Sequence, residues 1–268
     1  MLVDYNRFMR TMGKYFSSNR QANIKITNRC PVMCAHCREC STADSEAVIT
    51  KEIIDKVVQQ IVGTGEPQNW IVPLMGGEAL LYPDLCEYTI RACKEAKIAT
   101  NVYTSGFWWR DKEKYFKLLE KWQPETFCLS VNDWTVAKFG GIEYANEIAE
   151  FFARKDNPII LNYSEVYIDR PKYYNKLKYK SALFQYEAAP VGRAKQLIGK
   201  YGSPHWMCHG CELSGFWIET DGTIFGNCPA TIFGCKFGTV FDTSLADIYK
   251  MGRKDHCWLQ EQRDYGKA

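Results

Sequence analysis

The sequence predicts an α/β fold in which a parallel sheet forms an open or partial barrel and a small cysteine-rich module follows it. Three observations support this prediction. Strand-like runs alternate with helical patterns, and cysteine, glycine and polar residues gather where the strands end. From about Gly202 the composition changes to short glycine-rich and cysteine-rich segments. A chain of 268 residues can bury a core without disulfide bonds. The twelve cysteines therefore need another explanation.

Six runs rich in β-branched and aromatic residues are expected to be strands, namely 22–28, 69–75, 98–104, 126–132, 158–167 and 182–191. Between them, apolar residues recur at three- and four-residue steps, which predicts helices over 50–62, 83–96, 110–122 and 142–155. Six strands are too few for a closed eight-stranded barrel. We expect an N-terminal helical extension over 1–20, the partial barrel over 21–201, and a small α+β module of a β-hairpin and a helix over 202–268.

The overall charge and hydropathy exclude several classes of function. The chain carries 34 basic and 31 acidic residues, a net charge of +3, so it has no strong field for a polyanion. No run reaches the roughly 18 apolar residues that a membrane span needs. We therefore expect a cytoplasmic protein with no nucleic-acid or membrane partner. In that compartment, closely spaced cysteines indicate metal ligands or catalytic thiols rather than disulfides.

Four of the twelve cysteines fall within the stretch NRCPVMCAHCREC, directly after the first predicted strand. Cys30, Cys34 and Cys37 form a C-x3-C-x2-C pattern. Buried apolar thiols fit poorly beside the charged neighbours of this stretch. A zinc ion would need a fourth ligand, which Cys40 or His36 could supply. An iron–sulfur cubane held by three thiolates would instead keep one iron open to an outside ligand.

Polar and glycine residues also follow the later predicted strands. In a barrel of parallel strands, chemistry gathers on the loops at the carboxyl ends of the strands. The residues at these ends are Gly76, Gly77 and Glu78, then Ser105 and Gly106, then Asn132 and Asp133, and finally Pro190, Gly192 and Arg193. We expect them to lie on the same side of the sheet as the three cysteines.

The C-x3-C-x2-C pattern after the first strand, with a Gly-Gly-Glu phrase after the second, resembles the radical S-adenosylmethionine (radical SAM) superfamily. The resemblance implies a partial, TIM-like (β/α)6 barrel. It implies that Cys30, Cys34 and Cys37 hold a [4Fe–4S] cluster whose open iron binds the amino and carboxylate groups of S-adenosylmethionine. It also implies that reduction of this cluster yields a 5′-deoxyadenosyl radical, which abstracts a hydrogen atom from the substrate.

The same resemblance implies the residues that would contact S-adenosylmethionine, namely His36, Gly76, Gly77, Glu78, Ser105 and Ser130. His36 stands before the last cysteine, where the family usually has an aromatic residue near the adenine. The phrase Gly-Gly-Glu-Ala ends in alanine where proline is common, but it keeps the glycines and the carboxylate. The two serines are weaker matches, because serine is also a frequent turn residue.

The other cysteines divide into two groups. Cys40 matches no ligand of the family, and Cys86, Cys93 and Cys128 lie on apolar faces and are expected in the core. The second group flanks a predicted hairpin, FWIETDGTIFG, near the C-terminus. Its members are Cys208, Cys211, Cys228, Cys235 and Cys257.

Taken alone, the C-terminal group could be a zinc ribbon. In context it resembles the SPASM or twitch module of radical SAM enzymes. The closing run of cysteines is missing, which favours one auxiliary [4Fe–4S] cluster on Cys208, Cys211, Cys228 and Cys235, with Cys257 as a possible substitute for one of them.

The resemblance favours modification of a ribosomally made precursor peptide, by an oxidative crosslink, a thioether or an epimerisation. The auxiliary cluster would accept an electron, and a flavodoxin or ferredoxin would supply one. The alternatives are a dehydrogenase that oxidises a hydroxyl of a small molecule, such as a sugar or aminocyclitol, and a zinc-binding module without activity. Asp133, Glu165 and Arg193 are candidates for a general base, and nothing in the sequence chooses among them.

Overall fold

The computed structural model describes residues 20–154, 159–165, 173, 176–178, 183–187, 193, 215–226 and 236–251. Their strands form a nine-stranded sheet in the order β6-β5-β4-β3-β2-β1-β7-β8-β9. The first six are β1 (Gln21–Thr27), β2 (Ile71–Gly76), β3 (Ala99–Thr104), β4 (Thr126–Val131), β5 (Ile159–Glu165) and β6 (Leu183–Glu187). Each pairs in parallel with its sequence neighbour. This confirms the predicted parallel sheet.

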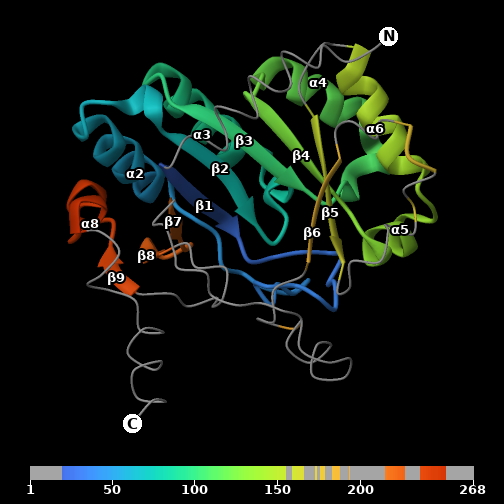
Figure 1. The fold of residues 1–268 in the computed structure, drawn as a ribbon, viewed down its shortest axis with the longest axis horizontal. Helices are drawn as coiled ribbons and strands as arrows, with labels where there is room; N and C mark the ends of the chain where they lie inside the picture. Colours follow the sequence, from blue (N-terminus) through green and yellow to red (C-terminus); the bar gives the residue numbers. More distant parts are fainter. Residues whose placement is uncertain are drawn as a thin grey trace.

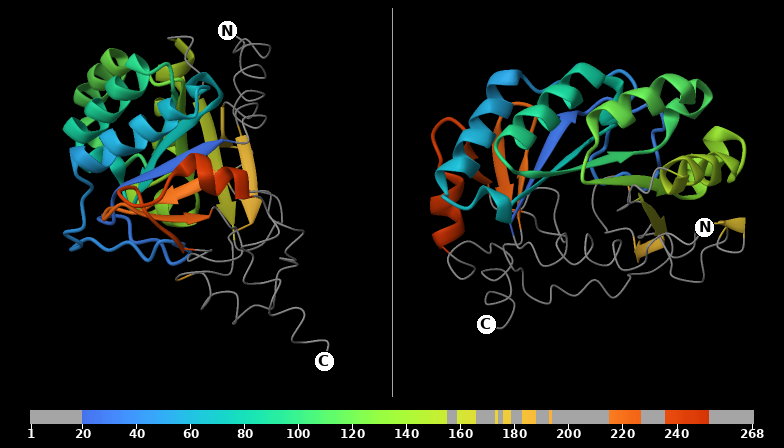
Figure 2. Two further views of the ribbon diagram at one scale, coloured as in Figure 1. Left: turned by 90° about the vertical axis from the view of Figure 1, so that its left-hand side faces the viewer. Right: turned by 90° about the horizontal axis from the view of Figure 1, so that it is seen from above.

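The helices between these strands cover one face of the sheet (Figures 1 and 2). They are α2 (Lys51–Gly63), α3 (Pro83–Glu95), α4 (Lys112–Trp122) and α6 (Glu143–Arg154), and the short α5 (Asp133–Phe139) follows β4 directly. Thr50 caps α2 by accepting a hydrogen bond from the N–H of Ile53, as a β-region threonine at a helix start should. Three short 3-10 turns, Pro67–Asn69, Ala79–Leu81 and Phe107–Asp111, complete the connections.

The main core lies between the helices and the sheet. Alternate residues of a strand point to the same face. The residues that point toward the helices include Ile24 on β1, Leu74 on β2 and Leu129 on β4, and they are fully buried. We call the opposite side of the sheet, on which the intervening residues lie, the inner face. Asn23, Lys25 and Asn101 are buried polar residues of this face.

Three further strands extend the sheet beyond β1. The strand β7 (Gly215–Ile218) pairs with β1 in parallel, and β8 (Thr223–Gly226) and β9 (Lys236–Thr239) continue it in antiparallel pairs. The hairpin of β7 and β8 is the predicted one, with Gly222 at φ +83° in its turn. The helix α8 (Leu245–Met251) lies beside α2.

Gln60 ties α2 to this C-terminal part. Its side-chain amide donates to the carbonyl oxygens of Val240 at 2.6 Å and Thr243 at 3.0 Å, and it accepts from the N–H of Leu245 at 2.7 Å. The strands β7, β8 and β9, which belong to the predicted C-terminal module, share one sheet with the strands of the barrel.

In the part of the chain that the structure describes, no helix is both long and apolar enough to cross a membrane. The predicted N-terminal extension, apart from Arg20, lies outside the described residues.

Candidate cofactor site

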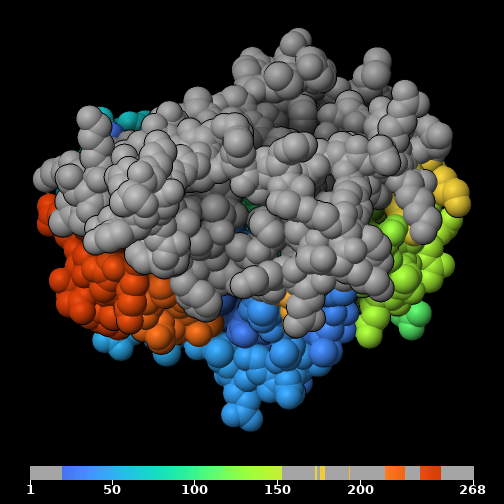
Figure 3. Space-filling model, turned by 60° about the horizontal axis from the view of Figure 1, so that its bottom comes forward, coloured from blue at the N-terminus to red at the C-terminus, as the bar shows by residue number. Residues whose placement is uncertain are grey.

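The chain between β1 and α2, residues 28–50, carries the C-x3-C-x2-C pattern, and we call it the cysteine loop. The N–H of Cys30 donates to the carbonyl oxygen of Thr42 at 2.7 Å, and the N–H of Thr42 donates to that of Asn28 at 3.3 Å. Figure 3 shows this loop, in blue, on the lower surface between the orange and red C-terminal elements and the yellow-green residues. The loop thus folds back on itself at the carboxyl end of β1.

The three predicted ligand thiols lie close enough to influence one another electrostatically. Burial, and next the charge of Glu78, raises the pKa of Cys30 to about 11. Burial, and next the charges of Cys30 and Cys37, raises the pKa of Cys34 to about 12. Cys30 and Cys34 are therefore protonated at neutral pH, and each must release its proton to bind a metal.

The cysteine loop offers three thiols as ligands, and both a zinc ion and an iron–sulfur cluster accept thiolates. Among the described residues, no three His, Cys, Asp or Glu side chains are grouped so as to hold one metal ion. A zinc ion needs every sulfur at about 2.3 Å from one point. A [4Fe–4S] cluster takes one thiolate for each ligated iron, so its thiolates surround the cluster and do not meet at a single ion. Three thiols on one loop satisfy that requirement, and the assignment of Cys30, Cys34 and Cys37 stays a prediction.

The Gly-Gly-Glu segment packs against the backbone that leads into the cysteine loop. The N–H of Gly77 donates to the carbonyl oxygen of Thr27 at 2.7 Å, and the N–H of Glu78 donates to that of Arg29 at 2.8 Å. A Cβ on Gly76, whose φ is +134°, would lie 2.3 Å from the oxygen of Thr27. A Cβ on Gly77 would lie 2.3 Å from the oxygen of Arg29. Only glycine permits this approach.

The carboxylate of Glu78 is buried and links the end of β2 to the end of β3. It accepts hydrogen bonds from the hydroxyl of Thr104 at 2.8 Å, from the N–H of Ser105 at 2.7 Å and from the hydroxyl of Ser105 at 2.6 Å. Burial raises the pKa of Glu78, and these hydrogen bonds lower it by less. Glu78 and Ser105, both expected to contact S-adenosylmethionine, thus contact each other, and their cofactor role stays a prediction.

His36 stacks on Trp134, with ring centres 4.4 Å apart and planes inclined by 22°. Trp134 belongs to α5, whose N-cap Asn132 accepts from the N–H groups of Trp134 and Thr135. Burial, and next the charge of Arg193, lowers the pKa of His36 to about 4. His36 is therefore a neutral aromatic ring at physiological pH, and its place beside the adenine stays a prediction.

Arg193 holds the cysteine loop from the side of β6. Its Nε donates to the carbonyl oxygen of Cys34 at 3.0 Å, and its Nη1 donates to that of Ser41 at 2.8 Å. Its backbone N–H donates to the carbonyl oxygen of Cys37 at 3.0 Å. A guanidinium stays charged in proteins and cannot take a proton. Of the three candidates for the general base, Arg193 is therefore the least suitable.

The remaining predicted site residues are more scattered. Ser130 lies near the end of β4, where its carbonyl oxygen accepts from the hydroxyl of Tyr144 at 2.9 Å. Asp133 is the first residue of α5 and is exposed. Glu165 is the last residue of β5, and the structure describes its backbone only. The five C-terminal cysteines lie outside the described residues, namely Cys208, Cys211, Cys228, Cys235 and Cys257.

The other described cysteines behave as expected. Cys86, Cys93 and Cys128 are buried, and Cys40 is exposed at the end of the C-x3-C-x2-C stretch. Cys128 lies on the inner face with Ile71, apart from the main core. Burial raises its pKa to about 12.

Sequence reasoning missed two residues beside the cysteine loop, Trp134 and Lys25. The signal for Lys25 was the strand alternation: Ile24 and Ile26 face the main core, so Lys25 lies on the inner face. Its side chain is 6 % exposed. Trp134 gave no comparable signal, because it follows β4 in a short helix that was not predicted.

Comparisons with known proteins identify the fold. No family model and no curated protein matches the sequence. Among solved structures, native anSMEcpe with bound AdoMet has a TM-score of 0.64 at 14 % identity, over 86 % of this chain and 80 % of that one. Streptococcus suis SuiB bound to precursor peptide SuiA has a TM-score of 0.61 at 15 % identity, over 92 % and 68 %. The chain has the radical SAM fold. SuiB bound to S-adenosylmethionine is also similar, with a TM-score of 0.59 at 13 % identity, over 92 % and 69 %.

The radical SAM fold explains the position of the cysteine loop. In a partial barrel, the connection after β1 and the ends of β2, β3 and β4 open at the same edge of the sheet. In this chain that edge carries the three thiols, the Gly-Gly-Glu segment and the stacked pair His36 and Trp134.

Proposed function

We propose that the protein is a radical SAM enzyme that holds a [4Fe–4S] cluster on Cys30, Cys34 and Cys37. The observation that carries this proposal is the contact of the cysteine loop with the Gly-Gly-Glu segment. Two separate motifs, 39 residues apart between Cys37 and Gly76 (76 − 37), meet at one edge of a radical SAM fold. When bound and reduced, the cluster supplies the electron that cleaves S-adenosylmethionine and so permits hydrogen abstraction from the substrate.

The residues of this chain would bind and orient the cofactors. The backbone of Gly76 and Gly77 would approach the methionine part closely, because neither residue carries a Cβ. The neutral ring of His36, held by Trp134, would face the adenine. Ser105 and Ser130 would supply polar contacts. Glu78 would hold Ser105 in place through the two hydrogen bonds between them.

The substrate that we propose is a ribosomally made peptide. SuiB, with a TM-score of 0.61, was solved bound to its precursor peptide, which supports this class. An auxiliary [4Fe–4S] cluster on Cys208, Cys211, Cys228 and Cys235, with Cys257 as a possible substitute, would accept the electron left by an oxidised substrate. The enzyme would work in the cytoplasm with a flavodoxin or ferredoxin as electron donor.

Anaerobic reconstitution tests the proposal. The wild-type protein should bind about eight irons, four for each cubane, and should release 5′-deoxyadenosine from S-adenosylmethionine under dithionite. Cys34→Ala should lose both the cluster signal of the cysteine loop and this cleavage. Cys40→Ala is the matched control, because it changes an exposed thiol of the same stretch, and it should keep both.

The outcomes discriminate the alternatives. A mass loss of two hydrogens on a cognate precursor peptide supports peptide modification, whereas turnover of a free sugar or aminocyclitol supports the dehydrogenase. A protein that binds zinc but no iron, and leaves S-adenosylmethionine intact, overturns the proposal.

A further inference from the structure

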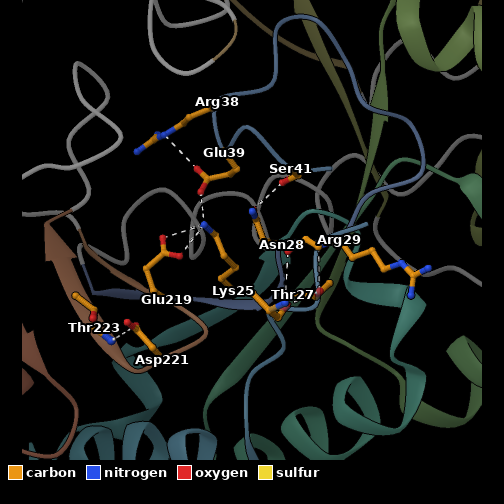
Figure 4. A network of polar contacts seen from close by, with 12 residues as sticks. Lys25, Thr27, Asn28, Arg29, Arg38, Glu39, Ser41, Glu219, Asp221 and Thr223 are labelled. Carbon is orange, nitrogen blue, oxygen red and sulfur yellow. Dashed lines mark hydrogen bonds and ion pairs between the residues drawn. The ribbon is translucent and has the colours of Figure 1, made fainter. Parts of the chain in front are cut away.

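Lys25 is a buried cation that joins separate segments of the site. Its Nζ lies 2.6 Å from a carboxylate oxygen of Glu39 and 2.7 Å from one of Glu219 (Figure 4). Glu39 belongs to the cysteine loop, two residues after Cys37, whereas Glu219 follows β7 directly. The ammonium therefore ties the loop to Glu219, which lies 194 positions after Lys25 in the chain.

The aliphatic part of Lys25 contacts a third segment. A Cβ on Gly76 would lie 3.3 Å from the Cγ of Lys25, so the side-chain stem runs beside the end of β2. Lys25 thus lies between the cysteine loop, the start of the Gly-Gly-Glu segment and the C-terminal strands.

Arg38 extends the same network toward β7. Its Nε lies 3.6 Å from Glu39, and its guanidinium lies 5.3 Å from the ring centre of Trp217. The two cations and the two carboxylates, Glu39 and Glu219, balance in formal charge. The cysteine loop is therefore linked to the C-terminal strands through two neighbouring residues, Arg38 and Glu39.

The network depends on the charge of Lys25. Burial lowers the pKa of Lys25, but the charges of Glu39 and Glu219, together with the hydrogen bonds to them, raise it by more in total, so the ammonium persists. The side chain of Glu39 is 9 % exposed. A carboxylate buried to that extent is costly once its cation is removed, and the segment that carries it must then move toward water.

We propose that Lys25 is a positioning residue that sets the cysteine loop against the Gly-Gly-Glu segment and, through Glu219, makes the position of the loop depend on the C-terminal strands. The inference rests on the proposed function only in treating the cysteine loop as the cofactor loop. The contacts of Lys25 with Glu39 and Glu219 are contacts between residues of the protein.

Thiol reactivity of the full-length apoprotein tests this role. Lys25→Met keeps the length of the side chain but removes its charge. Alkylation of Cys37 by iodoacetamide, followed by mass spectrometry, should become at least about tenfold faster than in the wild type. Cys86, a fully buried residue of α3, is the internal control for global unfolding, and its alkylation should change far less. Lys25→Arg should restore most of the slow alkylation of Cys37.

A matched control uses a second lysine–glutamate pair. Lys121→Met removes the charge from an ion pair with Glu87 of 2.5 Å in which the lysine side chain is 65 % exposed, and it should leave the reactivity of Cys37 unchanged. An unchanged ratio of Cys37 to Cys86 alkylation in Lys25→Met overturns the proposal. If that variant does not fold, Glu219→Gln carries the same test alone.

The dependence on the C-terminal strands has its own measurement. Glu219→Gln should also speed the alkylation of Cys37. In the double variant Lys25→Met, Glu219→Gln, the increase in the logarithm of this rate should be smaller than the sum of the increases in the two single variants. Additive effects overturn the coupling to Glu219. A protein that fails to bind iron but shows these alkylation rates would contradict the proposed function and leave this inference intact.

Discussion

Gly76 and Gly77 show that a residue expected to serve a cofactor can also be required by the fold. The sequence placed them at the end of β2 correctly, and the resemblance assigned them to S-adenosylmethionine. In the structure each glycine also faces a backbone oxygen at a distance that excludes a side chain. Glu78 likewise has hydrogen-bond partners within the protein. The same side chains can therefore support both the fold and the binding of cofactor.

Gly77→Ala should disrupt the contact between β2 and the cysteine loop. The new Cβ would meet the backbone oxygen of Arg29 at 2.3 Å, and backbone cannot rotate away as a flexible side chain can. We expect a lower melting temperature of the apoprotein and a loss of iron binding after reconstitution. Gly63→Ala is the control, since its Cβ would meet nothing within 4 Å. Equal iron content in both variants would contradict the expectation.

Glu78→Ala should destabilise the protein more than Glu78→Gln. Alanine leaves the buried donors of Thr104 and Ser105 without their acceptor, at a cost of about 1–3 kcal/mol in the free energy of unfolding. Glutamine keeps one acceptor oxygen at a similar position. Urea unfolding of the two variants measures the difference. If both variants unfold at the same urea concentration, the hydrogen bonds of Glu78 do not stabilise the fold.

At the scale of elements, local periodicity predicted most of the barrel. The six strands and four of the helices begin and end within a few residues of the predicted bounds, because alternation and helical spacing are local signals. The short helix α5 was missed, since seven residues are too few to show a helical period. The contact of Lys25 with Glu219 was missed for a different reason: no local pattern links residues 194 positions apart.

Asn132 starts α5 and so positions Trp134 beneath His36. Its side chain accepts from two N–H groups of the first turn, and Thr135 completes the capping box. Asn132→Ala should lower the free energy of unfolding by about 1 kcal/mol, whereas Asn132→Asp should keep most of it. Urea unfolding followed by tryptophan fluorescence checks this expectation. An alanine variant as stable as wild type would show that tertiary packing alone holds α5.

At the scale of the whole molecule, the C-terminal strands belong to the same sheet as the barrel. The sequence predicted the hairpin from its Asp-Gly turn, and the structure confirms it. The pairing of β7 with β1 was not predicted, because parallel pairing of distant strands leaves no mark in a short stretch. Without β7, one edge of β1 would carry unpaired backbone groups in a strand that is otherwise largely buried.

Deletion of residues 202–268 should therefore yield an aggregating protein. The deletion removes β7, β8, β9 and α8, exposes one edge of β1 and leaves Gln60 without its three partners. Size-exclusion chromatography of the truncated protein should show large species or no soluble material. A monodisperse, folded fragment of residues 1–201 would show that the barrel is an independent domain.

The central place of β1 also bears on translation. Among the described strands β1 leaves the ribosome first, and its neighbour β7 follows much later, since the side chain of Asn23 donates a hydrogen bond to the carbonyl oxygen of Phe216 across 193 positions. At about 5–20 residues per second, that gap corresponds to on the order of tens of seconds of synthesis. During this interval one edge of β1 is exposed and unpaired in the nascent chain and can pair with other chains. A chaperone that covers this edge would therefore raise the yield of native protein.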